Sequence, residues 1–212
     1  MTECKNFFWR AILIFWKHIP LYQECRNSGV EIKALLSLLI LTVAFSVTSL
    51  IQAASGNFPA VPLLLPLSLE NYFFWQSVLA LPWMAFGLAL TSSLVWLILR
   101  LLSGRNINFK QIFTLEVLSL LPAFSFLWLT HFLTAIFYAL GGSQKEWVDL
   151  VSVPGWFQSV YLFLIILSFI SGLLVFNLNF LGMKFTRKKS SRLVAGNLSF
   201  WLWIILIIIF VR

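Results

Sequence analysis

The sequence predicts an all-α fold, an integral membrane bundle of five transmembrane helices, and its composition is the first reason. Of the 212 residues, 60% are hydrophobic and only 10% are charged, and the mean hydropathy is +0.93. This is more apolar surface than a water-soluble core can bury. The 22 Phe and 10 Trp, with only 10 Gly and 7 Pro, favour long packed helices over the alternating strands of a membrane barrel.

The first 31 residues are predicted to form a cytoplasmic and interfacial segment. The stretch from Asn6 to Ile19, NFFWRAILIFWKHI, places Arg10, Lys17 and His18 among large aromatic residues. It is too short and too charged to cross a bilayer, which requires roughly 20 mostly apolar residues. We therefore expect an amphipathic helix that lies in the inner interface of the membrane.

A single transmembrane domain is predicted for residues 32–212, because five apolar stretches in it are long enough to cross a hydrocarbon core of about 30 Å. The second stretch contains Pro82 and is longer than a bilayer requires, so we expect a kink, a tilt or an interfacial first turn. The third contains Glu116, Pro122 and His131. The predicted spans are 32–51, 72–102, 109–140, 156–183 and 193–211.

The distribution of Lys and Arg predicts the orientation, because these residues are enriched in cytoplasmic loops. Of the 15 Lys and Arg residues, only Lys145 and Arg212 fall on one side of a five-span arrangement. We therefore expect a cytoplasmic amino terminus and an external carboxyl terminus. Arrangements with four or six spans would divide the basic loops between the two sides.

Two basic loops, after the second and the fourth span, are the predicted binding sites for anionic lipid headgroups. The net charge of +8 arises because acidic residues are scarce and basic residues gather beside apolar stretches. This pattern favours lipid headgroups over nucleic acid as the partner. The candidate residues are Arg105, Lys110, Lys184, Arg187, Lys188, Lys189 and Arg192.

Glu116 is the most informative side chain within a span. It follows Lys110 by about 9 Å along a helix, at 1.5 Å per residue. An acidic residue costs about 2.5–3.5 kcal/mol at the centre of a span and less at this depth, so it must face protein, water or a cation. One interpretation places it in a polar pocket at the inner leaflet. The other has it extend toward Lys110, or hydrogen-bond a neighbour in its protonated form.

Three asparagines lie at a depth similar to that of Glu116, namely Asn177, Asn179 and Asn197. If their helices adjoin, they form one buried cluster with Glu116. Hydrogen bonds of this kind between membrane helices contribute about 0.6 kcal/mol on average, so the ordinary role of such a cluster is to hold helices together. His131 lies in the outer half of its span. We expect it to pack in the bundle through a hydrogen bond, and the alternative is a role as a ligand or a proton relay.

Small residues recur at helical spacing in two spans. They are Ala85, Ala89 and Ser93 in the second span, and Ser168 and Gly172 in the fourth. Small side chains allow close approach of helix backbones. These small residues pack either within the bundle or against a second protein. That protein is a different membrane protein or another copy of this chain.

The chain lacks the sequence patterns of the common catalytic and metal sites. No GxxxxGK[ST] phosphate loop, HExxH zinc pair or GxSxG elbow is present. The two histidines lie on different segments, and the two cysteines, Cys4 and Cys25, fit no metal spacing. We therefore predict no catalytic residue, no metal site and no cofactor, and a protein that is not an enzyme.

Two blocks of the sequence resemble the Yip family of small polytopic membrane proteins, named for interaction with Ypt/Rab GTPases. These blocks are LLSGRNINFKQIFTLEVLSLLP, from Leu101 to Pro122, and LGMKFTRKKSSRLVAGNLSFWLW, from Leu181 to Trp203. In each, a glycine and a basic or polar turn precede a new apolar helix. The resemblance implies five spans with a cytoplasmic amino terminus.

The chain departs from the family at two points. Eukaryotic members carry a long cytoplasmic region before the first span, which is short here, so Rab binding is not carried over. Ser103 and Gly104 stand where a double glycine is common. The chain looks more like the short prokaryotic members, which implies a prokaryotic cytoplasmic membrane.

The sequence leads to three hypotheses of function. The first is a non-enzymatic protein that organises lipids or partner proteins at the inner leaflet. The second is an accessory subunit of a transport or export complex, bound through the small-residue faces. The third is a lipid-translocating protein that uses Glu116 and the asparagines as a polar groove.

Overall fold

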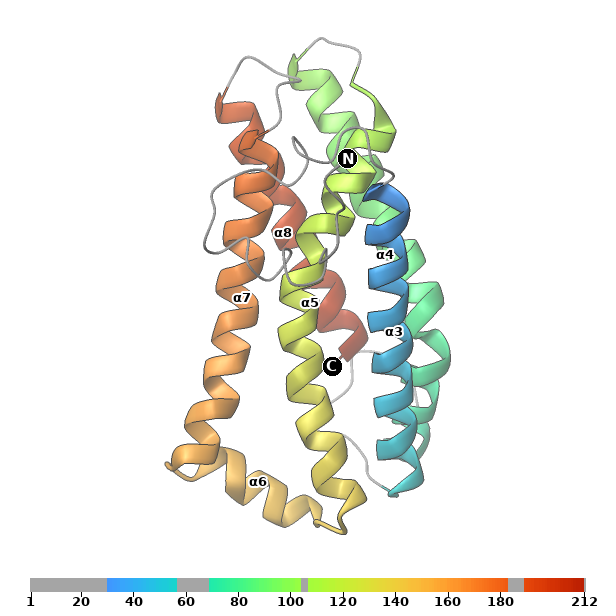
Figure 1. Ribbon diagram of the computed structural model, residues 1–212, viewed down its shortest axis with the longest axis vertical. Coiled ribbons are helices and arrows are strands. Elements are labelled where there is room, and N and C mark those ends of the chain that lie inside the picture. Colours follow the sequence, from blue (N-terminus) through green and yellow to red (C-terminus); the bar gives the residue numbers. More distant parts are fainter. Residues whose placement is uncertain (1–29, 57–68, 104–106, 183–188, 212) are drawn as a thin grey trace, which may run out of the picture.

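A computed structural model describes residues 30–56, 69–103, 107–182 and 189–211 of the chain. This part is all-helical and contains no strand (Figure 1). Its elements are α3 (Val30–Ala54), the 3-10 turn η1 (Leu69–Asn71), α4 (Tyr72–Ser103), α5 (Phe109–Ala139), α6 (Gln144–Ser152), α7 (Trp156–Gly182) and α8 (Lys189–Val211).

Five helices in the described part are long and apolar enough to cross a membrane, namely α3, α4, α5, α7 and α8. Within the described ranges, the prediction of an all-α fold with five helices long and apolar enough to span a membrane is confirmed. The observed bounds differ by more than two residues at two ends: α3 continues through Gln52 to Ala54, and α8 begins at Lys189, so that Lys189 and Arg192 belong to its first turn. The amphipathic helix predicted over residues 6–19 lies outside the described residues, as do Arg105, Lys184, Arg187 and Lys188.

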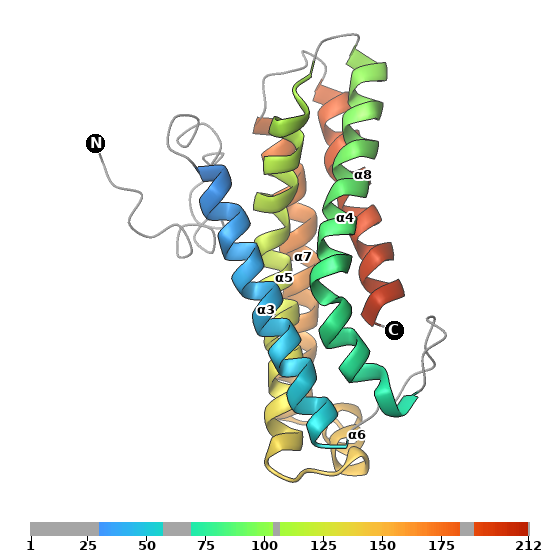
Figure 2. The ribbon, with the colours of Figure 1, turned by 90° about the vertical axis from the view of Figure 1, so that its right-hand side faces the viewer.

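Helix α5 lies at the centre of the bundle. It packs against α3, α4 and α7, while α8 packs against α7 and α4 (Figures 1 and 2). All residues from Thr114 to Pro122 are buried, whichever direction they face around the helix. A helix that is apolar and buried on every side must be enclosed by other helices, because no side of it is left for the surroundings.

Proline is present within two of the long helices, and both continue through it. Helix α4 changes direction in its amino-terminal half, the half that contains Pro82 (Figure 2). Proline has no backbone N–H and its ring displaces the carbonyl four residues earlier, so a bend is the expected result. The bend agrees with the kink predicted for this long span.

Helix α6 was not predicted from the sequence. It crosses one end of the bundle between α5 and α7 (Figure 1). Its start is a capping box: the Glu146 N–H donates to the Ser143 hydroxyl at 3.3 Å, and the Ser143 N–H donates to the Glu146 carboxylate at 2.8 Å. Trp147 anchors the helix by packing edge-on against Phe157 and Tyr161. The signal for α6 was the S-x-x-E spacing from Ser143 to Glu146.

Charges separate between the two ends of the bundle. We call the end where α5 and α8 begin the basic end, and the end covered by α6 the acidic end. Among the side chains that the structure describes, the basic end holds Arg100, Lys110, Lys189 and Arg192. The acidic end holds Lys145 together with Glu70, Glu146 and Asp149.

Candidate functional site

Glu116 is fully buried and faces α8. One carboxyl oxygen, Oε1, accepts a hydrogen bond from the Ser199 hydroxyl at 2.6 Å, and Oε2 accepts one from the indole Nε1 of Trp203 at 3.0 Å. Ser199 and Trp203 are four residues apart on α8 and therefore share one face of that helix. These contacts join Glu116 to a neighbouring helix; the alternative stated above expected such a bond for the protonated carboxyl group, and here both oxygens accept.

Gly87 of α4 provides the space for the Trp203 indole. A Cβ atom at this glycine would lie 2.8 Å from Cη2 of the Trp203 ring, closer than carbon atoms pack. The missing side chain on α4 thus allows the large ring of α8 to lie inside the bundle and reach Glu116. The carboxyl site therefore depends on three helices, although only α5 and α8 supply its polar groups.

The three asparagines form two further contacts near this site. Asn179 of α7 donates to the Ser119 hydroxyl at 2.9 Å, one turn along α5 from Glu116. Asn197 of α8 donates to Oδ1 of Asn177 of α7, also at 2.9 Å. Glu116, Asn177, Asn179 and Asn197 are thus distributed over three hydrogen-bonded contacts among α5, α7 and α8.

The sequence did not identify the partners of these four residues. Ser119, Ser199 and Trp203 were not candidates, although Ser199 and Trp203 lie on the same face of a strongly apolar helix. A polar pair on one face of an apolar span is the signal that points to such partners. Which helix each residue faces cannot be read from spacing alone.

A second polar cluster surrounds His131 in the half of the bundle toward the acidic end. The Ser49 hydroxyl lies 2.9 Å from Nε2 of His131, and it also donates to Oε1 of Gln76 at 3.1 Å. The Gln52 amide donates to the His131 carbonyl at 3.2 Å, and Phe45 stacks on the imidazole with ring centroids 4.4 Å apart. The contacts agree with the packing role expected for His131, and they connect α3, α4 and α5.

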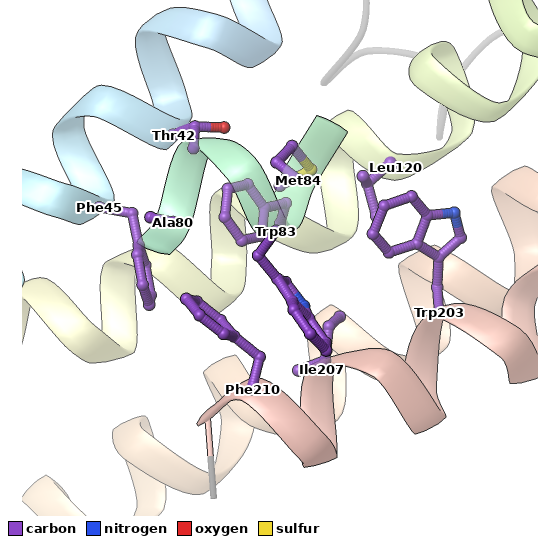
Figure 3. A pocket seen from close by; sticks show the side chains of 10 residues that line it. Thr42, Phe45, Ala80, Trp83, Met84, Leu120, Trp203, Ile207 and Phe210 are labelled. Atoms are coloured by element: carbon purple, nitrogen blue, oxygen red, sulfur yellow. The ribbon is translucent and has the colours of Figure 1, made fainter. Parts of the chain in front are cut away.

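An apolar cavity lies between the two polar clusters (Figure 3). Its volume is about 20 Å³, and its lining includes Trp203, which donates to Glu116, and Phe45, which stacks on His131. Thr42 supplies a hydroxyl, but this group already donates to the Leu38 carbonyl at 2.8 Å. A buried water needs two to four polar partners, and this lining is almost entirely apolar.

The apolar cavity separates the two polar clusters along the bundle. Glu116 and His131 are about 22 Å apart along α5, at 1.5 Å per residue. Leu120 and Phe124 lie between them on α5 and line the cavity. The described residues therefore place two separate polar clusters in the bundle, and an apolar layer lies between them.

The described residues of the basic end differ in their contacts and exposure. Nη1 of Arg192 donates to the Leu181 carbonyl at 2.6 Å and so ties the start of α8 to the end of α7. Lys110 and Lys189 are exposed. The Arg100 guanidinium lies over the Trp96 ring, 5.2 Å from its centroid. Arg100 was not among the predicted headgroup-binding residues.

The described residues contain no group of three or more His, Cys, Asp or Glu that could hold a metal ion. The fold and these sites define a class: a multi-pass helical membrane protein whose polar contacts connect its helices. No protein-family model, curated protein or solved structure matches the chain.

Proposed function

We propose that this chain is a non-enzymatic, Yip-type protein of a prokaryotic cytoplasmic membrane that organises anionic lipids or partner proteins at the inner leaflet. The observation that supports it is the separation of charge between the basic and the acidic end. Basic residues near an anionic surface contribute about 1 kcal/mol each to membrane attraction. The exposed Lys110 and Lys189 are positioned to make this contribution.

The orientation in this proposal follows from the same charges. Lys and Arg mark the cytoplasmic side of membrane proteins, so the basic end is assigned to the inner leaflet. The Yip assignment itself rests on the blocks Leu101–Pro122 and Leu181–Trp203, and it stays a prediction.

A second candidate function is that of an accessory subunit in a transport or export complex. One observation favours it: Ala85, Ala89 and Ser93 of α4 are exposed in the bundle. The small residues of α7 are used internally, since Ser168 donates to the Ala123 carbonyl at 2.8 Å and Gly172 adjoins Phe200. The α4 face therefore remains available to a partner.

The translocation hypothesis receives less support from the geometry. It requires Glu116 to line a polar groove, whereas Glu116 is fully buried and both its oxygens accept hydrogen bonds from α8. A Glu116→Leu variant in a liposome lipid-flip assay tests this hypothesis, which predicts a loss of flipping.

The experiment that tests the leading proposal changes the basic end and measures lipid preference. The purified protein is placed in vesicles of mixed anionic and zwitterionic phospholipid, and the lipids that remain after mild detergent extraction are quantified by mass spectrometry. The variant replaces with Gln the residues Lys184, Arg187, Lys188 and Lys189.

We expect this variant to lose its enrichment in anionic lipid or to insert in the inverted orientation. Lys145→Gln at the acidic end is the matched control and should change neither property. An unchanged lipid composition together with an unchanged orientation in the fourfold variant would overturn the proposal.

A further inference from the structure

A groove between α3 and α4 opens on the outside of the bundle. Its volume is about 140 Å³. Leu35 and Leu39 of α3 and Leu81 and Ala85 of α4 line it and are exposed, so they form its rim. Buried residues that also line it, including Met84 and Leu88, form its floor. A groove lined in this way on the outer surface of a membrane bundle opens to hydrocarbon rather than to water.

The exposed face of α4 leads from this groove to a cation at the basic end. Ala85, Ala89 and Ser93 are exposed at four-residue spacing, and Arg100 is exposed at the end of the same face. Because these side chains are small, the surface of α4 stays low from the groove to Ser93, and Trp96 and Leu97 lie between Ser93 and Arg100. A flexible apolar chain can therefore lie along the small residues and pass beside Leu97 to Arg100.

The spacing of the groove and the cation fits the depth of one leaflet. Ala85 and Arg100 are separated by about 22 Å along α4, at 1.5 Å per residue. A bilayer with its headgroups is about 40–45 Å thick, so half of it corresponds to the same length. Arg100 thus lies at headgroup depth when the groove lies at the depth of acyl-chain ends.

Arg100 also has the chemistry of an interfacial anion site. A guanidinium presents a planar set of donors that matches phosphate, and it can stack on an aromatic ring at the same time. Trp96 supplies that ring, and the indole nitrogen of Trp96 donates to the Ile107 carbonyl at 2.8 Å. The ring that supports Arg100 is therefore itself held in place by the segment that precedes α5.

We propose that this surface binds one anionic glycerophospholipid, with its phosphate on Arg100 and the end of an acyl chain in the groove between α3 and α4. The inference deepens the proposed function and rests on it, because it specifies a single lipid site at the end that attracts anionic lipid. It uses none of the predicted headgroup-binding residues.

A second helix is the competing occupant of the same face. Small residues at the contact favour close approach of two helix backbones. Phe86 adjoins Ala85 and Leu97 follows Ser93 by four residues, and these large side chains are 54% and 46% exposed. A flexible acyl chain adapts to these projecting side chains more readily than a rigid helix does. A partner helix also supplies no phosphate for Arg100.

The test uses the full chain in lipid nanodiscs of phosphatidylglycerol and phosphatidylcholine, followed by native mass spectrometry after progressive delipidation. We expect one phosphatidylglycerol to be retained by the unaltered protein. Arg100→Gln should lower the retained phosphatidylglycerol relative to phosphatidylcholine about tenfold, the ratio expected for one lost charge-assisted hydrogen bond. Ala85→Phe, which fills the groove, should lower the retention of both lipids.

Matched variants control for general effects. Leu174→Phe changes an exposed residue of α7 and should leave the retained lipid unchanged. The milder Ala85→Leu distinguishes a filled groove from a misfolded bundle, and circular dichroism checks the helical content of each variant. Retention that does not change in Arg100→Gln and Ala85→Leu would overturn the inference.

Two further measurements separate this inference from its competitors. Ala89→Cys, in a chain whose native cysteines are replaced by Ser, should give no disulfide-linked dimer in nanodiscs that contain excess lipid. Efficient dimer formation that Ala85→Phe abolishes would assign this face to a second copy and overturn the lipid site.

If the variant with Lys184, Arg187, Lys188 and Lys189 replaced loses bulk anionic enrichment and still retains the single lipid, the groove site is supported independently of the basic loop. If bulk enrichment persists in the unaltered protein while no lipid is retained, the groove site fails and the proposed function stands.

Discussion

Oε2 of Glu116 lies 3.0 Å from the indole nitrogen of Trp203, and this contact connects the central helix α5 to α8. The main packing partners of α5 are α3, α4 and α7, whereas α8 packs chiefly against α4 and α7. Long side chains therefore link α5 with α8 where their backbones remain apart. The finding gives Glu116 a structural role that its depth alone did not define.

Replacing Glu116 by Leu should destabilise the bundle more than replacing it by Gln. Leu leaves the Trp203 N–H and the Ser199 hydroxyl without their acceptor, and a buried unpaired donor costs about 1–3 kcal/mol. Gln keeps one acceptor oxygen and the shape of the side chain. Unfolding by SDS titration measures the difference. Equal stability of the two variants would show that the hydrogen bonds to α8 contribute little.

Gly87→Ala should destabilise the bundle by disturbing Trp203. The added Cβ would lie 2.8 Å from the indole, and overpacking of this kind costs about 1–3 kcal/mol. Tryptophan fluorescence should shift and the midpoint of thermal unfolding should fall. Gly155→Ala is the control, because the nearest atom to its Cβ is 3.9 Å away. A similar loss in both variants would contradict the specific role of Gly87.

The order of α6 should depend on pH through Glu146. The backbone N–H of Ser143, and then its hydroxyl, donate to the carboxylate and lower the pKa of Glu146. A lowered pKa in the folded state stabilises the helix above the carboxyl group's ordinary pKa, and this stabilisation is lost as pH falls through the lowered value. The protection of α6 amides, measured as the hydrogen-exchange rate relative to the intrinsic rate at the same pH, should therefore fall on acidification. Ser143→Ala should lower this protection at neutral pH and weaken its pH dependence.

Cysteine labelling should place the basic end in the cytoplasm. A cysteine at Lys189 should resist a membrane-impermeant thiol reagent in intact cells and react after the cells are opened. A cysteine at Asp149 of α6 should react in intact cells. The reverse pattern would overturn the assigned orientation and, with it, the proposed contact with the inner leaflet.

The five spans could be predicted because they depend on length and apolar composition alone, both of which are local properties. The bounds were less accurate at charged ends, since Lys189 and Arg192 can start a helix at the interface as readily as they can occupy a loop. Helix α6 was missed because its nine residues are too few and too polar to qualify as a membrane span. Its capping residues were the available signal.

The candidate polar residues could be located by depth but not by partner. Helical rise gives each of these residues a position along its own span, whereas the pairing of Glu116 and the asparagines depends on which helices adjoin and on how each is rotated. Spacing within one span contains neither quantity. The same limit applies to His131, whose neighbours Ser49 and Gln52 belong to a helix far earlier in the chain.

The enclosed position of α5 has a consequence for how the protein is made. A ribosome delivers helices in chain order, so α5 enters the bilayer well before α8. During that interval the Glu116 carboxyl group lacks the two donors that α8 later supplies. Until synthesis has passed Trp203, the Glu116 carboxyl group in the nascent bundle must therefore be either protonated or shielded by the insertion machinery.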